Sequence, residues 1–301
     1  YVLDVASGAV LRKVDTAVGD TTTPAGFAKI AGYALSAFTD NTATAVYGGD
    51  LLGNLWRFDL TVDPPALLKL AQLRDGSASP AGGRPQPITT RPELAVIDGS
   101  PVVYVGTGRM LGLSDYDDPA TLSPALPWAY QQSVYAIKDS GVALGNVRAS
   151  GALVQQVIND IPGVGRWPTV NPVNWSVNNG WFVDFNPGNT SPGERVVEDP
   201  NLALGTLEVK TNVPTNDACS AGGDSWTYQF NYRTGDAIQS APLLDATHRT
   251  LAVKTTGKTS AGTTIVRLPS GAFKGITTTS TGEIVTFSIN IGGAGGSSRR
   301  V

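Results

Sequence analysis

The densest group of side chains that could do chemistry is a set of three carboxylates at Asp115, Asp117 and Asp118. Carboxylate oxygens close together in a turn-rich segment are the kind of ligand that Ca²⁺ takes, although the ion needs about six to eight oxygens. A solvated polar loop is the alternative interpretation of the same residues. We therefore treat Asp115, Asp117 and Asp118 as candidate calcium ligands.

Three tryptophans, Trp167, Trp175 and Trp181, lie in or beside the least regular stretch of the chain. Flat aromatic rings stack on sugars and dominate the energetics of protein interfaces when they are exposed. Packing in the hydrophobic core is the alternative for all three. The sequence thus offers them as a candidate surface for a carbohydrate or a protein partner.

Single copies of histidine and cysteine disfavour several other chemistries. His248 is the only histidine, so a metal site built on histidine or a Ser-His-Asp triad is not expected, and its context predicts a polar surface turn. Cys219 is the only cysteine and cannot form an internal disulfide. It would pair outside this chain or be a buried thiol.

The charge and hydropathy patterns exclude further classes of function. A net charge of −3 without a block of like charge gives no footprint for nucleic acid or anionic lipid. No apolar run reaches the roughly 18 residues that a membrane helix requires. The chain starts at Tyr1 inside a strand-like pattern, which we interpret as a piece of a longer protein.

The clearest element is a predicted hairpin at residues 46–60. Trp56, Phe58 and Leu60 recur with period two and should share a buried face, while Arg57 and Asp59 lie on the other face. Between the two strands, Asp50 is flanked by glycines. Aspartates in such turns accept hydrogen bonds from main-chain N–H groups, and we expect this role here.

Further strands are predicted along the whole chain. An Asp98-Gly99 pair between apolar runs predicts a second tight hairpin at residues 93–106. Alternating or β-branched runs predict strands within residues 1–15, 25–39, 67–73, 132–138, 180–185, 195–197, 205–213, 225–232, 250–255, 263–268 and 283–289. Residues 142–180 are interpreted as an irregular insertion, and no helix longer than two turns is expected.

One strand pattern recurs: alternating apolar residues, then an acidic or polar residue, then usually glycine. It occurs at residues 1–8, 55–59, 134–141 and 227–235, and more weakly at 285–292. A propeller blade has four strands in about 40–50 residues and buries its faces only against its neighbours. The repeat therefore predicts an all-β fold, a partial β-propeller of about four or five blades with inserted loops over residues 1–301. A β-sandwich is the alternative.

Several motifs in the same order resemble a known family. They lie at residues 46–60, 105–108, 132–137, 193–197 and 214–223. Together they resemble the C-terminal domain of the PilY/PilC family of type IV pilus tip-associated adhesin and biogenesis proteins. The resemblance implies a modified quinoprotein-like propeller that is exported through the periplasm to the pilus tip or outer cell surface.

The resemblance also implies a function and partners. It implies a non-enzymatic protein that supports pilus assembly and extension, twitching motility and adhesion to a host or abiotic surface. Implied partners are minor pilins or the pilus tip complex, together with the N-terminal part of the same parent chain. A quinoprotein-type dehydrogenase and a generic protein-binding propeller are the alternatives.

The sequence departs from the family pattern in the loop where the family would bind calcium. The resemblance implies a calcium loop just before the strand at residue 46, where this sequence has Asp40 and Asn41 as its strong side-chain oxygen ligands. Two such ligands are too few for Ca²⁺. We therefore expect no certain cofactor: calcium is possible, but the calcium loop of the family is degraded or absent in this sequence.

Overall fold

The computed structural model describes residues 1–36, 39–77, 82–112, 115, 131–185, 187, 193–215 and 222–293. Within these ranges the secondary structure is β, and no α-helix is recorded. No helix of this part of the chain is long and apolar enough to cross a membrane. The strands form a short N-terminal hairpin and four larger sheets, which we call blades A to D in chain order.

The N-terminal hairpin and blade A come first along the chain. The hairpin consists of β1 (Val2–Leu3) and β2 (Val10–Arg12), and both strands are exposed. Blade A is an antiparallel meander of β3 (Ile30–Tyr33), β4 (Ala45–Gly49), β5 (Asn54–Asp59) and β6 (Ala66–Gln72).

Blade B has five strands in the order β10-β13-β9-β8-β7. Its strands are β7 (Glu93–Ile97), β8 (Ser100–Gly106), β9 (Ser133–Lys138), β10 (Val154–Gln156) and β13 (Gly180–Asp184). The turn between β7 and β8 has positive φ at Asp98 (48°) and Gly99 (80°), as the Asp-Gly hairpin predicts. β10 joins β13 in parallel, at the outer edge.

Blade C has six strands in the order β11-β12-β17-β16-β15-β14. Its strands are β11 (Ile158–Ile161), β12 (Gly165–Pro168), β14 (Asn201–Ala203), β15 (Thr206–Pro214), β16 (Gly223–Asn231) and β17 (Ala252–Thr255). Blade D has three: β18 (Ser260–Arg267), β19 (Phe273–Thr279) and β20 (Ile284–Ser288).

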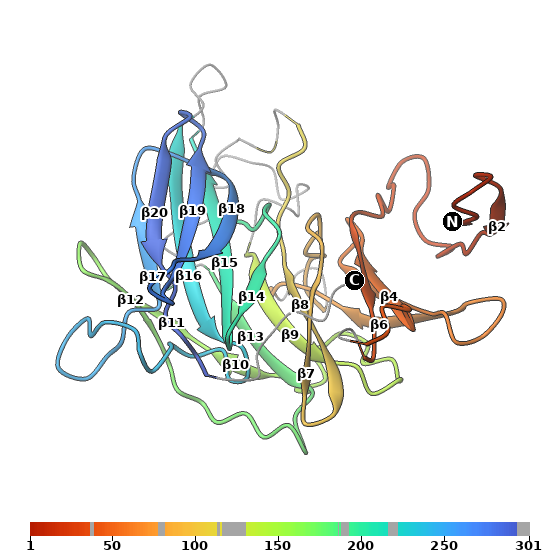
Figure 1. Ribbon diagram of the computed structural model, residues 1–301, viewed down its shortest axis with the longest axis horizontal. Coiled ribbons are helices and arrows are strands. Elements are labelled where there is room, and N and C mark those ends of the chain that lie inside the picture. The colour runs from red at the N-terminus through yellow and green to blue at the C-terminus, as the bar shows by residue number, and fades with distance from the viewer. Residues whose placement is uncertain are drawn as a thin grey trace.

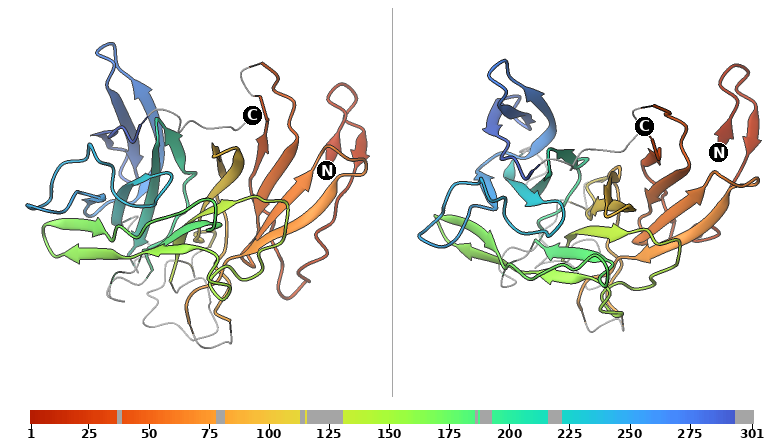
Figure 2. Two further views of the ribbon diagram at one scale, coloured as in Figure 1. Left: turned by 90° about the horizontal axis from the view of Figure 1, so that it is seen from below. Right: turned by 60° about the horizontal axis from the view of Figure 1, so that its bottom comes forward.

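The blades follow one another along an open arc, with the N-terminal hairpin at one end and blade D at the other (Figures 1 and 2). The edge strands β3, β7 and β14 of blades A, B and C are neighbours, because β7 contacts both β3 and β14. One core cluster lies between blades A and B and a second between blades B and C. The sheets do not close into a ring, so the fold is a partial β-propeller, as the sequence predicts.

The recurring sequence pattern marks one position in each blade. We count the strands of each blade from the edge strands β3, β7, β14 and β18. On this count β5, β9, β16 and β20 are the third strands of blades A, B, C and D, and each carries a copy. The polar residue that ends the pattern makes a turn with its own main chain: Asp59 accepts from Thr61 N at 2.9 Å, Asp139 from Gly141 N at 2.8 Å and Asn231 from Arg233 N at 3.0 Å. The chain therefore leaves β5, β9 and β16 in the same way. The copy of the pattern at residues 1–8 lies in the N-terminal hairpin, outside the blades.

Three local expectations need correction. In β5 both faces are covered at its start, because Leu55 is fully buried as well as Trp56, while Arg57 and Phe58 are half-buried. Residues 142–180 hold the short strands β10, β11 and β12, which extend the outer edges of blades B and C. β19 was not predicted, because its alternation Lys274, Ile276, Thr278 is mostly polar.

Candidate functional site

Asp50 organises the hairpin between β4 and β5. Its Oδ1 accepts hydrogen bonds from the main-chain N–H groups of Leu52 and Asn54, both at 2.9 Å. Its Oδ2 accepts from Asn54 Nδ2 at 2.9 Å and from Trp56 Nε1 at 2.8 Å. The expected role in the turn is confirmed, and the indole contact shows that the same carboxylate also fixes the buried face of β5.

The polar face of this hairpin forms a second cluster. Arg57 pairs with Asp59 at 3.1 Å, as the i and i+2 spacing predicts, and also with Asp139 of blade B at 2.9 Å. Tyr47 donates its hydroxyl hydrogen bond to Asp139. Burial and the adjacent Asp139 charge raise the pKa of Tyr47 above its ordinary value. These groups tie blade A to blade B.

The loop that precedes β4 uses its acidic residue locally. The Asp40 carboxylate is exposed and accepts a hydrogen bond from Thr42 N at 2.8 Å. The Thr42 side chain and this N–H lower the pKa of Asp40. Such a contact is an ordinary Asx turn. The degraded calcium loop inferred for this position from the resemblance remains a prediction.

Of the three candidate calcium ligands, only Asp115 falls within the described residues. Its side chain is buried, and Oδ2 accepts from Leu111 N at 2.7 Å, Gly112 N at 3.1 Å and Arg109 Nε at 3.1 Å. Arg195, also buried, donates to its carbonyl oxygen. The ion pair with Arg109 already balances the negative charge of the Asp115 carboxylate.

Asp117 and Asp118 lie outside the described residues, as does Cys219. Within the described part of the chain, no group of three or more His, Cys, Asp or Glu side chains is placed to hold a metal ion. The calcium role of the three carboxylates therefore remains a prediction.

Two of the three candidate surface tryptophans are core residues, which corrects the expectation of a shared aromatic surface. Trp181 is 0% exposed and donates from Nε1 to the Tyr232 carbonyl at 3.1 Å. Trp175 is 6% exposed and donates to the Arg233 carbonyl at 2.9 Å. Both indoles bridge blades B and C, where their rings fill the core and their N–H groups find main-chain acceptors.

Trp167 has a different position, at the surface of the outer hairpin of blade C. Its half-buried ring stacks on His248 with the ring centroids 3.7 Å apart. His248 is held in turn by Asp245, whose Oδ2 lies 2.7 Å from Nδ1 and whose Oδ1 accepts from His248 N at 2.8 Å. The expected surface turn at His248 is thus present and supports an aromatic pair.

A cavity of about 150 Å³ opens beside this pair. Its lining combines the two rings with Pro168 and Val170 and with polar side chains of Asp236, Gln239, Thr247 and Arg249. Burial raises the pKa of Asp236, which accepts from Thr234 Oγ1 at 2.6 Å. An apolar platform beside hydrogen-bonding groups is suited to a polar ligand with one flat apolar face.

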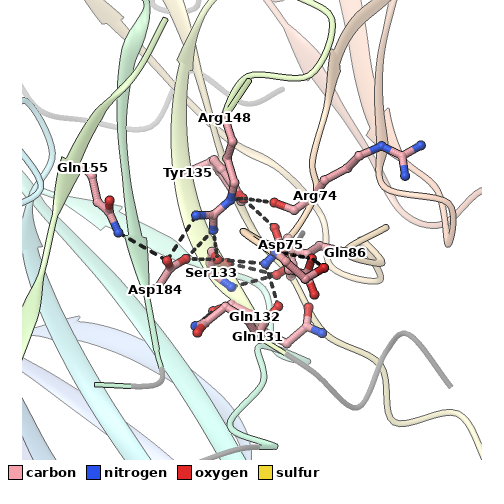
Figure 3. A network of polar contacts seen from close by, with 12 residues as sticks. Arg74, Asp75, Gln86, Gln131, Gln132, Ser133, Tyr135, Arg148, Gln155 and Asp184 are labelled. Atoms are coloured by element: carbon pink, nitrogen blue, oxygen red, sulfur yellow. Dashed lines mark hydrogen bonds and ion pairs between the residues drawn. The ribbon is translucent and has the colours of Figure 1, made fainter. Parts of the chain in front are cut away.

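A polar network joins blade B to the segment after blade A (Figure 3). The guanidinium of Arg148 donates to both carboxylate oxygens of Asp184, to Ser133 Oγ at 2.9 Å and to Tyr135 Oη at 3.1 Å. Gln86, from the segment after blade A, donates to Ser133 Oγ at 2.9 Å and accepts from Tyr135.

Aromatic rings support the same network. The Arg148 guanidinium lies 4.3 Å from the centre of the Phe182 ring, which stacks on Tyr135. Burial raises the pKa of Tyr135 to about 12, so its hydroxyl keeps its proton and can donate. Every arm of the guanidinium is used in the interior, and the cluster fastens the segment after blade A to blade B.

A second buried cluster holds blade C together. Arg166 donates to Glu194 at 2.8 and 3.0 Å and stacks 3.7 Å from the ring centre of Trp226. Glu194 also accepts from Tyr228 Oη at 2.6 Å and from Thr211 Oγ1 at 2.7 Å. Burial raises the pKa of Glu194 despite these partners. Sequence reasoning missed this cluster, since its members come from separate elements.

The fold and these clusters define the class of protein: a partial β-propeller whose blades are joined by buried polar clamps. No protein-family model matches the sequence. The type IV pilus biogenesis factor PilY1 homolog of Xylella fastidiosa is 30% identical over 79% of this chain and 17% of its own length. The type IV pilus biogenesis factor PilY1 of Pseudomonas aeruginosa strain PAK is 30% identical over 78% and 22%.

A solved structure agrees in fold. The crystal structure of the Pseudomonas aeruginosa PilY1 C-terminal domain matches with a TM-score of 0.70 and 23% identity, covering 94% of this chain and 64% of that one. The chain belongs to the PilY1 family. It spans about a fifth of the length of these curated relatives.

Proposed function

We propose that this chain is the propeller part of a type IV pilus biogenesis factor and acts without catalysis, through binding. The observation that carries the proposal is the 30% identity to PilY1 proteins over more than three quarters of the chain. The proposal extends to pilus extension, twitching motility, adhesion and a position at the pilus tip or outer surface. Residues 1–301 then form one propeller unit of a longer polypeptide.

The architecture supports a binding role. The Arg57 cluster fixes blade A to blade B, and the Arg148 cluster fixes blade B to the segment after blade A, so the loops and outer edges sit on a rigid support. Binding residues are commonly found on loops that a rigid scaffold positions. Minor pilins, the pilus tip complex and a host or abiotic surface are the partners proposed for it.

Deletion of the gene that encodes the parent protein tests the role in the pilus. We expect fewer surface pili, measured in sheared fractions, and smaller twitching zones, both restored by the wild-type gene. Normal piliation and motility in the deletion strain would contradict the proposal. An absorbance spectrum of the purified chain with a bound quinone chromophore would instead favour a dehydrogenase.

Trp167 is the residue we propose for surface contact. Its ring and that of His248 line the cavity beside β12, whereas Trp175 and Trp181 are buried. Replacing Trp167 by alanine in the parent protein should reduce attachment to surfaces while surface pili persist. Val177→Ala, at a position that is 74% exposed, is the matched control. Equal attachment by both variants would remove Trp167 from the proposal.

A further inference from the structure

The cavity beside Trp167 lies at the outer edge of blade C. Its walls come from the end of β12 and from two turns, within residues 236–239 and 247–249. The hairpin of β11 and β12 is the part of blade C farthest from β14, the edge strand that contacts blade B, and it projects from the arc (green in Figure 2). Because the blades of a propeller pack face to face, further blades of a longer polypeptide would leave this edge open.

Two hydrogen-bonded turns fix the walls of the cavity. Leu244 N donates to the His248 carbonyl at 2.8 Å, which closes the turn that carries His248 and Arg249. Asn231 N donates to the Asp236 carbonyl, also at 2.8 Å, and holds the turn that carries Asp236. The polar side chains of the lining are therefore positioned before any ligand arrives.

The two charged groups of the lining have hydrogen-bonding capacity left over. Asp236 is 7% exposed, and the hydrogen bond from Thr234 engages Oδ1 alone, so Oδ2 has no partner among the described residues. Arg249 uses Nη1 for the Ala241 carbonyl at 2.8 Å and forms no ion pair in the described part of the chain. Buried polar groups are normally hydrogen-bonded, so a cavity between two such groups is suited to a polar ligand.

The apolar part of the lining is flat. It consists of the stacked rings of Trp167 and His248 together with Pro168 and Val170. Within the ranges that the structure describes, Trp167 Nε1 and the Gln239 amide have no hydrogen-bond partner. The platform thus has hydrogen-bonding groups at its rim.

The charges that face the cavity are balanced. Asp236 supplies a carboxylate and Arg249 a guanidinium, while His248 is already paired with Asp245 at 2.7 Å. A charged ligand would be attracted by one of the two free groups and repelled by the other. A neutral ligand rich in hydroxyls can bond to both, because each hydroxyl donates one hydrogen bond and can also accept.

The size of the cavity limits such a ligand to one ring. Its volume is about 150 Å³, below the roughly 300–1,000 Å³ of sites for drug-sized ligands. A pyranose has a face of C–H groups that packs on an indole and a rim of hydroxyls. The ring of a phenylalanine or proline in a peptide would fill the same space but leave Asp236 and Arg249 without new partners.

We propose that this cavity binds the terminal neutral hexopyranose of a glycan, with a C–H face of the ring on Trp167 and hydroxyls on Asp236 and Arg249. The proposal rests on the binding function proposed above and names the ligand class of the Trp167 surface. Asp236 Oδ2 accepts from one hydroxyl, and the Arg249 guanidinium donates to the oxygens of others. The rest of the glycan leaves through the opening of the cavity.

Binding is measured on the purified parent protein, in which any segment able to fill the cavity is also present. The probes are the methyl pyranosides of glucose, galactose, mannose and N-acetylglucosamine, titrated under saturation-transfer difference NMR. We expect at least one to bind saturably at about millimolar concentration, because so small a ligand makes few contacts. Beads that display this sugar as a terminal residue should retain the protein, and the free glycoside should release it.

Variants of the lining make the site specific. Trp167→Ala and Arg249→Gln should each weaken binding at least tenfold, and Asp236→Asn, which replaces Oδ2 by a donor, at least threefold. Trp167→Phe keeps an aromatic face and should retain most of the binding. Arg267→Gln, at an exposed arginine of β18, is the matched control for Arg249→Gln and should bind as the wild type does.

Three results would overturn the proposal. The first is absence of saturable binding of all four glycosides to the parent protein. The second is binding that Trp167→Ala and Arg249→Gln leave unchanged while both variants keep the wild-type circular dichroism spectrum, because the sugar would then bind elsewhere. The third is failure of the sugar-bearing beads to retain a protein that binds the free glycoside.

These results are separate from the test of the proposed function. If Trp167→Ala reduces surface attachment but no glycoside binds, the ligand of this surface is not a sugar and the inference fails, while the role in the pilus still stands on piliation and twitching of the deletion strain.

Discussion

At the scale of single residues, Asp50 shows how one carboxylate fixes a recognisable motif. It receives two main-chain N–H groups, an amide and an indole within six residues of sequence. Each donor is close in sequence, so glycine-flanked turn chemistry was sufficient to predict the main-chain contacts. The indole contact was not predicted.

Replacing Asp50 by alanine should destabilise the chain by roughly 3 kcal/mol, since several buried donors lose their acceptor and each costs about 1–3 kcal/mol when unpaired. Asp50→Asn keeps one carbonyl oxygen and should lose less. Urea unfolding followed by tryptophan fluorescence measures both. A loss under about 1 kcal/mol for the alanine variant would show that solvent replaces the carboxylate.

At the scale of elements, the blades and the segments between them are held together by side chains that no local pattern connects. Gln86 and Ser133 are 47 residues apart, and Tyr47 and Asp139 are 92 apart. Period-two alternation and turn residues predict each strand, but they carry no information about which blade faces which. Sequence reasoning expects charged residues at the surface, so it did not predict the buried arginines.

Arg148→Lys should lower the free energy of unfolding by about 2–3 kcal/mol, although it conserves the charge. An ammonium cannot reach Asp184, Ser133 and Tyr135 together, and hydrogen bonds of charged groups contribute about 1.5–3 kcal/mol. Chemical denaturation gives the loss, and hydrogen exchange should rise in residues 84–88. Gln155→Ala, which removes an exposed contact of 3.3 Å to Asp184, is the control and should change stability little.

The interface between blades C and D should respond to pH through Glu198. Burial raises the pKa of Glu198 to about 7; Glu208 and Lys210 of β15 and Ser260 of β18 face it. Burial also raises the pKa of Glu208 and lowers that of Lys210, which lies 3.6 Å from Glu208 Oε1. With both glutamates ionised, this cluster would carry one uncompensated negative charge.

The direction in which the unfolding free energy changes with pH follows from proton binding at Glu198. Between pH 4.5, the ordinary value for Glu198, and pH 7, the folded chain holds the Glu198 proton more tightly than the unfolded chain. Stability from this group is therefore greatest below pH 4.5 and is lost as pH rises to about 7. Glu198→Gln should reduce the fall in unfolding free energy between pH 5 and 8 by roughly 2 kcal/mol. Identical pH profiles for both chains would contradict this assignment.

At the scale of the whole molecule, the stability of the arc of blades depends little on the N-terminal hairpin. Tyr1, Val5 and Val10 are 79%, 101% and 59% exposed. Its ion pair to blade A, between Arg12 and Asp63, is also exposed, and such pairs contribute little. A cavity of about 110 Å³ separates parts of the hairpin from Phe27 and Phe58.

Removal of residues 1–15 should therefore change the unfolding free energy by less than about 1 kcal/mol. Thermal unfolding by circular dichroism checks this, with the Asp50→Ala variant as a positive control for loss of blade A stability. A drop of several kcal/mol would mean that the hairpin packs on the blades more tightly than its exposure indicates.

The sequence by itself determined the β class, most strands, the Asp-Gly hairpin and the repeat that marks the third strand of every blade. These features come from side-chain alternation and turn chemistry, which act between residues a few positions apart. Only the tertiary structure decided that Trp175 and Trp181 are buried while Trp167 reaches the surface, and that arginines clamp the blades. Those outcomes depend on contacts between distant segments, which the alternation of side chains within one strand does not encode.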